Sequence, residues 1–519
     1  MNGHSKITAF GWAFLGLALF ALGGCHRGGG CDGPPLDTQR LIGLRSMLFS
    51  QGGGSSAYLV MPNPIDATRN GSTMATSSGL QSYLRGFDLP SLASPQRLEN
   101  SFLKVRIRET NDDVSTLARP DAQGRYAFPV TDVHYSEAMA YYSLVAEMGY
   151  VEALGFPVVK SRPLYVMVRA NTEDNQPNAL YDHNYLNPSL PRTIRLFGDT
   201  DYAPGVDAEM YRHEFGHLFN ESSSHEVGMD FAGDNGAIYT EGSAIHECMA
   251  DYLAQSYGND PAIGRWIARN FDGYAPGQPL RSAVDYQGSR IRFQDVAFND
   301  GAGGLPERYH TAEWCTRVLW EIRQSFVDRD PRLGAVYADR LMFSAMGFLR
   351  KDTSLSQFRD ALVQADSQLH CGGNEDTILN AFESRGFARS FPQLARPLDV
   401  QVAPVGLDQN YQPTQIAPGV TIAFKLRIVN RNNETARNIR VKLEPLDNRF
   451  YATTYQQGYG DLAPGQSIQV GVDRNGLALD SSVFAETDRG AQRGSRLRYR
   501  IRLLVENGPE SSFQGDVAL

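Results

Sequence analysis

Beyond Pro392, apolar and polar residues alternate with a period of two, in short runs separated by turns. The first run places Ile422, Phe424, Leu426 and Ile428 on one side, and the later runs cover residues 439–443, 468–472 and 497–503. Strands with one buried and one solvated face form antiparallel sheets, so residues 393–519 are predicted to form an all-β sandwich.

Helical spacing dominates the chain between Asp207 and Phe391. Asp207 is expected to start the first of these helices, and the later ones are predicted at residues 243–255, 311–326, 339–348, 355–365 and 376–385. Upstream, the spacing predicts a helix capped by Ser136, followed by buried strands at 163–168 and 194–198. Short alternating runs between residues 57 and 130, such as 102–107, predict a β-rich lead-in.

The first 24 residues have the pattern of a secretory signal, with Lys6 followed by an apolar run that ends in small residues. Leu22-Gly23-Gly24-Cys25 resembles the lipobox of bacterial lipoproteins, in which the cysteine is lipidated. The alternative is an ordinary signal peptide with an incidental Cys25. Residues 25–55 are rich in Gly and Pro and are predicted to be a tether to the membrane.

Composition narrows the classes of partner. The net charge of −9, with no basic run, argues against nucleic acid. Nothing after the leader is apolar enough to span a bilayer, so a lipid would be the only anchor. Without Cys25, an even number of cysteines is left for one or two disulfides, and we expect Cys315 to pair with Cys371.

The segment His213-Glu214-Phe215-Gly216-His217 carries the candidate chemistry. Residues four apart share one face of a helix, so His213 and His217 can bind one zinc ion together. Glu214 lies beside them and can take a proton from the metal-bound water. This is the H-E-x-x-H pattern of zinc peptidases.

A third ligand decides the class of zinc site. The elongated H-E-x-x-H-x-x-G-x-x-H motif is excluded because Asn220 and Ser223 occupy its Gly and His positions, and His225 lies two residues too far. Glu247 is the candidate, and Asp251 follows on the same face of the next predicted helix. The alternative is that these two carboxylates form a solvated acidic face.

Residues 241–251, Glu-Gly-Ser-Ala-Ile-His-Glu-Cys-Met-Ala-Asp, resemble the second zinc motif of the thermolysin-like and fungalysin-like gluzincins. The resemblance implies that Glu247 is the third zinc ligand and that Asp251 orients His213. His246 stands where thermolysins have Asn.

Two further residues match the family less closely. His310, at the start of a predicted helix, takes the place of the histidine that stabilises the oxyanion in these families. The alternative is a histidine that only packs at a helix start. Tyr239 resembles the assisting hydroxyl of thermolysins, although it is one residue out of register.

The resemblance covers residues 132–391 and implies an α+β fold. It predicts a two-lobed zincin catalytic domain, with a mixed N-terminal lobe and a helical C-terminal lobe. The alternating pattern after Pro392 predicts that the sandwich following this domain is immunoglobulin-like. Too few residues precede this unit for the family's long propeptide. No convincing calcium loop is present, and we interpret residues 230–235 as a surface turn. The predicted parts are 1–24 signal peptide, 25–55 tether, 56–130 lead-in, 131–392 metallopeptidase domain and 393–519 sandwich.

The sequence therefore predicts an exported, lipid-anchored zinc endopeptidase with one Zn²⁺ per chain. We expect a monomer in the bacterial cell envelope, facing the periplasm or the outside, that acts on peptides with an apolar residue after the cut. The alternative function is a non-catalytic surface lipoprotein that retains a peptidase-like scaffold and uses its sandwich for binding. Degenerate peptidases commonly lose the general base or a ligand, whereas this chain keeps Glu214 and all three ligand positions.

Overall fold

The structure is a computed structural model of the 519-residue chain. It describes residues 54–519, apart from 111, 171–176, 183–188, 199–201, 225–238, 299–305, 411, 455 and 471–482. The predicted signal peptide, most of the tether, Cys25, His225 and the acidic turn at 230–235 lie outside the described residues.

The N-terminal part is mixed α+β. One small sheet has the strand order β2 (Arg85–Asp88), β1 (Ser56–Leu59), β4 (Arg125–Tyr126), and the next has the order β3 (Leu103–Arg106), β5 (Leu164–Ala170), β7 (Arg192–Phe197), β6 (Asn178–Asp182). In the second sheet β3, β5 and β7 are parallel, while β6 runs antiparallel along the edge. The central strands consist mostly of buried aliphatic residues, and β7 ends at Phe197, immediately before Gly198, which has a φ of 92°.

Helix α3 (Val133–Ala153) packs against these sheets, and the short helix α2 (Pro64–Thr68) precedes it in the chain. The cap of α3 differs from the prediction. Asp132 accepts the hydrogen bond of the His134 N–H, so the helix begins three residues before Ser136, which is buried inside it. A carboxylate followed by a helix-compatible turn outcompetes the serine further on.

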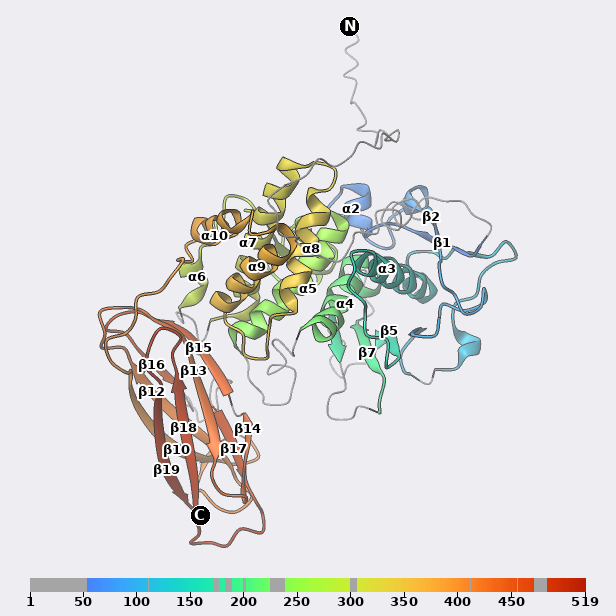
Figure 1. Cartoon of the computed structure of the whole chain (residues 1–519). Coiled ribbons are helices and arrows are strands. Elements are labelled where there is room, and N and C mark those ends of the chain that lie inside the picture. Colours follow the sequence, from blue (N-terminus) through green and yellow to red (C-terminus); the bar gives the residue numbers. More distant parts are fainter. Residues whose placement is uncertain are drawn as a thin grey trace.

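The helical part closely follows the predicted pattern. It consists of α4 (Ala208–Ser223), α5 (Glu241–Gly258), α6 (Phe293–Ala297), α7 (Arg308–Arg329), α8 (Gly334–Met346), α9 (Leu355–His370) and α10 (Glu375–Ser384), with the two-stranded pair β8 (Ala262–Ile263) and β9 (Arg281–Ser282). Asp207 caps α4, as expected, by accepting a hydrogen bond from the Glu209 N–H. Helix α5 packs between α4 and α7 (Figure 1), so three consecutive long helices meet at one place.

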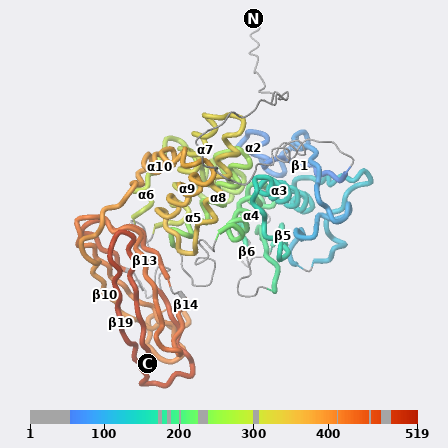
Figure 2. Tube along the Cα trace, viewed as in Figure 1, coloured from blue at the N-terminus to red at the C-terminus, as the bar shows by residue number. Residues whose placement is uncertain are grey.

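Residues 399–518 form two antiparallel sheets that share a separate hydrophobic core (Figures 1 and 2). The larger sheet contains β10 (Asp399–Leu407), β11 (Pro413–Thr414), β12 (Thr421–Val429), β14 (Phe450–Thr454), β16 (Ser467–Val470) and β17 (Val483–Thr487); the smaller has the order β15 (Gln456–Leu462), β13 (Ala436–Pro445), β18 (Arg496–Leu504), β19 (Ser511–Ala518). Ring contact between Phe424 and Tyr499 joins the two inner faces. The fold is mixed α+β, as the sequence predicts, and immunoglobulin-like topology stays a prediction.

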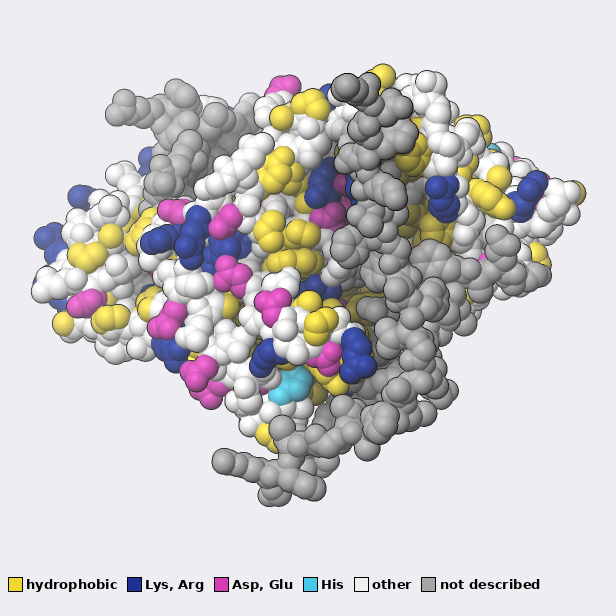
Figure 3. Space-filling view, turned by 90° about the horizontal axis from the view of Figure 1, so that it is seen from above, with side chains coloured by type: hydrophobic (Ala, Val, Ile, Leu, Met, Phe, Trp, Pro, Cys, Tyr) yellow, Lys and Arg dark blue, Asp and Glu magenta, His cyan; other side chains and the backbone are white. Residues whose placement is uncertain are grey.

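One hydrophobic core extends from Ala57 to Phe387, and the second begins at Leu394. The lead-in segment therefore packs with the helical part, and its strand β3 joins the same sheet as β5. The predicted domain boundaries stay predictions. Among the described residues, no helix combines the length and the apolar character that a bilayer span requires. On the face seen in Figure 3, acidic and basic side chains are interspersed.

The predicted Cys315–Cys371 disulfide is wrong. Cys315 is a free thiol that is fully buried and faces the free thiol of Cys248 across the α5–α7 contact. Cys371 is disulfide-bonded and is the C-cap residue of α9. The helical phase of α7 turns Cys315 inward toward α5, which removes it from any partner on the surface.

Candidate metal centre and active site

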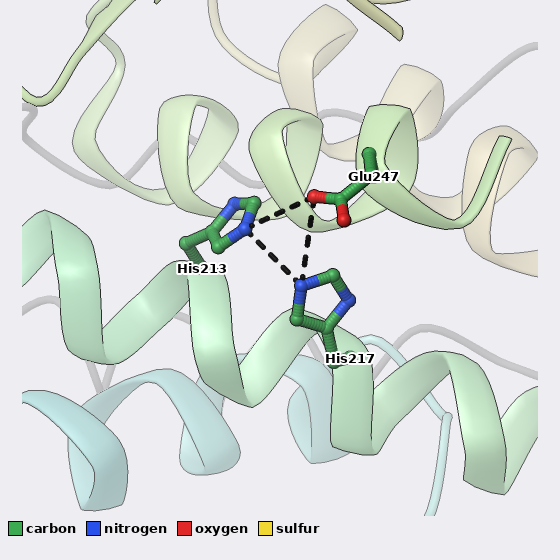
Figure 4. Close-up of side chains that lie close together, drawn as sticks. All are labelled: His213, His217 and Glu247. Carbon is green, nitrogen blue, oxygen red and sulfur yellow. Dashed lines mark hydrogen bonds and ion pairs between the residues drawn. The ribbon is translucent and has the colours of Figure 1, made fainter. Parts of the chain in front are cut away.

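Helix α4 presents two imidazoles to the same point. His213 and His217 lie one turn apart, and their Nε2 atoms are 3.1 Å from each other (Figure 4). Both side chains are buried in the contact between α4 and α5. The predicted pair is therefore formed by the helix itself, as the spacing requires.

Helix α5 brings the third candidate ligand from a separate element. Glu247 Oε2 lies 3.4 Å from His213 Nε2 and 3.7 Å from His217 Nε2 (Figure 4). Among the described residues, these three form a group whose ligand atoms all lie within 4.8 Å of one another. Glu247 is 3% exposed, so it does not belong to a solvated acidic face.

The spacing of these atoms fits zinc. Donors bound to a tetrahedral ion at about 2.0–2.2 Å lie about 3.3–3.6 Å from one another. The three measured separations of 3.1, 3.4 and 3.7 Å bracket that range. Glu247 Oε2 is buried without a hydrogen-bond donor among the described residues, so a cation between the three atoms would satisfy it.

The protonation states also suit a metal. Burial lowers the pKa of His217 far below its ordinary value and leaves the imidazole neutral. Burial opposes the ionisation of Glu247, yet His217 and His213 hold the pKa of its carboxyl well below its ordinary value. Burial also lowers the pKa of His213, but Asp251 and Glu247 outweigh this effect and raise it to about 10.

Asp251 lies where the resemblance implies. Its Oδ1 atom is 2.8 Å from His213 Nδ1, so the carboxylate faces the imidazole nitrogen that points away from the other ligands. Arg281 on β9 holds this carboxylate from the opposite side, with its Nε 2.6 Å from Oδ2 and its Nη2 2.7 Å from Oδ1. Sequence reasoning missed Arg281, because no local pattern links it to a helix thirty residues upstream.

His246 is a second residue that the sequence did not assign. Its ring stacks on that of His217 with centroids 4.5 Å apart, and the two Nδ1 atoms are 2.9 Å apart. If the Nε2 atom of His217 is to offer a lone pair to a metal, its Nδ1 atom carries the hydrogen and donates it to His246. His246 can therefore fix which nitrogen of the His217 ring is free to face a metal.

Glu214 lies on α4 immediately after the first ligand and is 3% exposed. Burial raises the pKa of its carboxyl to about 7, although the charge of His213 and a hydrogen bond from the backbone N–H of Tyr181 oppose this shift. Tyr181 belongs to the edge strand β6. The candidate general base thus lies between helix α4 and strand β6, the last strand of this sheet among the described residues.

The two remaining predicted residues, His310 and Tyr239, differ in their exposure to solvent. His310 is exposed in the first turn of α7, where its backbone N–H donates to the Glu307 side chain. Tyr239 is 2% exposed, and its hydroxyl is hydrogen-bonded to Thr311. None of the described contacts joins the Tyr239 hydroxyl to the three ligand residues.

Comparison with known proteins agrees with this geometry. Residues 204–390 match the model of the fungalysin metallopeptidase family (M36). Over 216 residues the chain is 23% identical to the "Probable extracellular metalloproteinase 2" of Arthroderma benhamiae and to the "Extracellular metalloproteinase 2" of Trichophyton rubrum. Each match covers 38% of this chain and 33% of the relative, so the chain spans about a third of the length of the curated relatives it matches.

A solved structure, the FixG-related protein from Vibrio parahaemolyticus, matches 23% of this chain and 94% of its own at 12% identity, with a TM-score of 0.15. That score carries no argument about the fold. The family match includes all three ligand positions and Glu214. Residues 204–390 are therefore similar to a family of metallopeptidases.

Proposed function

We propose that the protein is an exported, lipid-anchored zinc endopeptidase of the gluzincin type. The proposal rests on the convergence of His213, His217 and Glu247 at a spacing that fits zinc. Glu214 follows His213 directly on helix α4. A glutamate as the third ligand, supplied by a second helix, is the feature that defines this class of site in the resemblance above.

A zinc ion held by these three residues would polarise the scissile carbonyl and lower the pKa of a water molecule. Glu214 takes a proton from the attacking water and returns it to the leaving amine, which suits a carboxyl whose pKa lies at about 7. Asp251 and Arg281 keep the His213 ring in the orientation that the first ligand needs.

His310 donates a hydrogen bond to the oxyanion that forms on the substrate carbonyl. Its exposed position on the first turn of α7 leaves the ring accessible to a bound peptide. Tyr239 is the second candidate for this role. Its buried hydroxyl, bonded to Thr311, would have to leave that partner in order to reach a substrate.

A peptide substrate is supported by the edge of the second sheet. Within the described part of the chain, strand β6 pairs only with β7, and Leu180 at its centre is 45% exposed. An extended peptide can add to such an edge through main-chain hydrogen bonds. Because the Tyr181 N–H contacts Glu214, a peptide on this strand would pass directly beside the general base.

The location rests on the sequence. Cys25 in its lipobox would be the lipidated N-terminus, and the Gly-rich residues after it would tether a monomer to the cell envelope. Radiolabelled palmitate incorporated into the unmutated precursor, but not into its Cys25→Ala variant, would support the anchor. Equal labelling of the two forms would refute it.

Metal removal tests the activity. A soluble form that begins after Cys25 is treated with a chelator, and cleavage of unfolded casein is followed before and after one equivalent of zinc is returned. We expect activity to disappear and then return. Bound zinc without any cleavage would favour the non-catalytic lipoprotein, and the absence of bound zinc would exclude the metallopeptidase.

A further inference from the structure

Strand β15 of the C-terminal β region lies against the helices of the metal centre. All seven of its residues, Gln456–Leu462, are buried although most are polar or glycine. The Gly458 N–H donates to the Tyr239 carbonyl at 2.9 Å, and the Gln457 side chain reaches the same oxygen at 3.4 Å. Tyr239 lies two residues before helix α5, so β15 contacts the chain where the Glu247 helix begins.

The same strand contacts the segment that leads into α7. A β-carbon on Gly460 would lie 2.3 Å from Pro306 Cγ and 2.6 Å from the Ala297 carbonyl oxygen. A β-carbon on Gly458 would lie 2.8 Å from the Tyr239 carbonyl oxygen. Glycine is therefore required at both positions, because the β strand and the helix starts are in direct backbone contact.

A buried charge network completes this contact. Arg437 on β13 is 1% exposed, pairs with Glu241 at the first position of α5, and lies 2.8 Å from Asp461 on β15. Its guanidinium also lies over the rings of Phe293, Phe387 and Phe391, at 4.8, 5.1 and 5.2 Å from their centroids. The other oxygen of Glu241 accepts the Leu355 N–H at the start of α9 at 2.7 Å, so the carboxylate links three elements.

We propose that Arg437 is a positioning residue for the metal centre, and that the C-terminal β region is a fixed part of the peptidase rather than a separate binding module. Arg437 holds Glu241, and with it the first turn of α5. Glu247 follows six residues later on the same helix, about 9 Å along its axis. A displacement of the helix start therefore moves the third ligand relative to His213 and His217.

This inference rests on the proposed zinc site, so its test measures the metal as well as the activity. The full-length soluble chain and its Arg437→Met variant are loaded with zinc, and zinc release to a chromogenic chelator is timed. We expect release from Arg437→Met to be about 10-fold faster than from the unmutated chain, the lower end of the loss of metal affinity that follows removal of a direct partner of a metal ligand. Arg437→Lys keeps the positive charge but loses the planar guanidinium group, so its zinc release rate should lie between those of Arg437→Met and the unmutated chain.

Arg502→Gln is the matched control. Arg502 also pairs with two glutamates, Glu444 and Glu510, but it is partly exposed on β18, away from the α5 contact. We expect its zinc release rate and its kcat to equal those of the unmutated chain. A purely structural role for Arg437 predicts a lower melting temperature with an unchanged zinc release rate, and that result would overturn the proposal.

A second variant covers the case in which Arg437→Met does not fold. Gly458→Ala leaves every charge in place and presses on the backbone and ring of Tyr239 and on the Thr240 Cα atom, at the start of α5, so it should also accelerate zinc release. Unchanged release from both Gly458→Ala and Arg437→Lys contradicts the inference. If the unmutated chain itself binds no zinc, the proposed function fails instead, and the two failures are thereby distinguished.

Discussion

Gly216 on helix α4 faces Ala250 on helix α5 so closely that a β-carbon at position 216 would lie 2.5 Å from the Ala250 Cα atom. Gly216 is the fourth residue of the His213–His217 motif, and Ala250 lies between Glu247 and Asp251. The absence of a side chain at position 216 therefore sets the separation of the two helices, and this separation brings the ligands of α4 within reach of Glu247.

Replacing Gly216 by alanine should separate the two helices. We expect a loss of about 1–3 kcal/mol in the free energy of unfolding, because overpacking outweighs the higher helix propensity of alanine. The affinity for zinc should also fall, because the separation of the helices moves Glu247 away from His213 and His217. Gly258→Ala is the control, since a β-carbon there meets only a side-chain atom at 3.6 Å. Denaturant unfolding of both variants checks the prediction, and equal stability of the two would contradict it.

Replacing Arg281 by methionine should weaken zinc binding without removing a ligand. Asp251 would lose its bidentate partner and, being fully buried, would hold the His213 ring less firmly. We expect about 10–100-fold lower zinc affinity, measured by competition with a chelator. Arg290→Met, an exposed arginine nearby, should leave the affinity unchanged. An Arg281 variant with the affinity of the unmutated chain would show that Asp251 needs no support.

The stacked pair of His217 and His246 makes a separate prediction. His246→Leu removes the acceptor for the His217 Nδ1 hydrogen, and we expect about 10-fold weaker zinc binding. His246→Asn keeps a carbonyl oxygen as an acceptor and should retain most of the affinity. Chelator competition on the two variants, side by side, decides the matter. Equal affinities would mean that His246 only packs against the ring.

The stability of the fold should fall between pH 6 and pH 8 because of Asp207. Burial raises the pKa of this helix-capping carboxyl to about 7, although hydrogen bonds from the Glu209 N–H and Asn63 oppose the shift. A carboxyl that binds its proton more tightly in the folded state stabilises the fold fully below its ordinary pKa of 3.8, and this contribution is lost as the pH rises through 7. The expected change is about 1 kcal/mol between pH 6 and pH 8.

Asp207→Asn is the matching variant, because an amide still caps the helix but does not titrate. The free energy of unfolding at pH 6 and pH 8 should differ less for this variant than for the unmutated chain. Asp66, Glu209 and Arg212 act on the same carboxyl and are left in place. If both proteins show the same pH dependence, another group is responsible for it.

The sequence predicted the convergence of the three candidate ligands because their spacing is local. His213 and His217 need only one regular helix, and Glu247 with Asp251 needs only a second. Arg281 and His246 were not predicted, since their roles depend on how distant segments pack. The same limit applies to Cys315, whose inward orientation depends on the contact between α5 and α7.

Strand β15 shows why the C-terminal contacts were out of reach. Gln456, Gln457 and Gly458 do not alternate between apolar and polar, because the strand packs between the core of the β region and the backbone of the helical part and has no solvated face. The alternation of apolar and polar residues identifies only strands with one buried and one solvated face, so it does not predict such a strand. The burial of Arg437 could not be predicted for a similar reason. Its carboxylate and aromatic partners come from distant segments, which only the folded chain brings together.

Zinc content and casein cleavage, measured together for the soluble chain and its Glu214→Gln variant, test the central claim most directly. The account predicts one zinc per chain in both proteins and a loss of cleavage of about 10²–10⁴-fold in the variant, because Glu214 moves the proton but does not hold the metal. Equal cleavage by the two proteins, or no zinc in either, would contradict it.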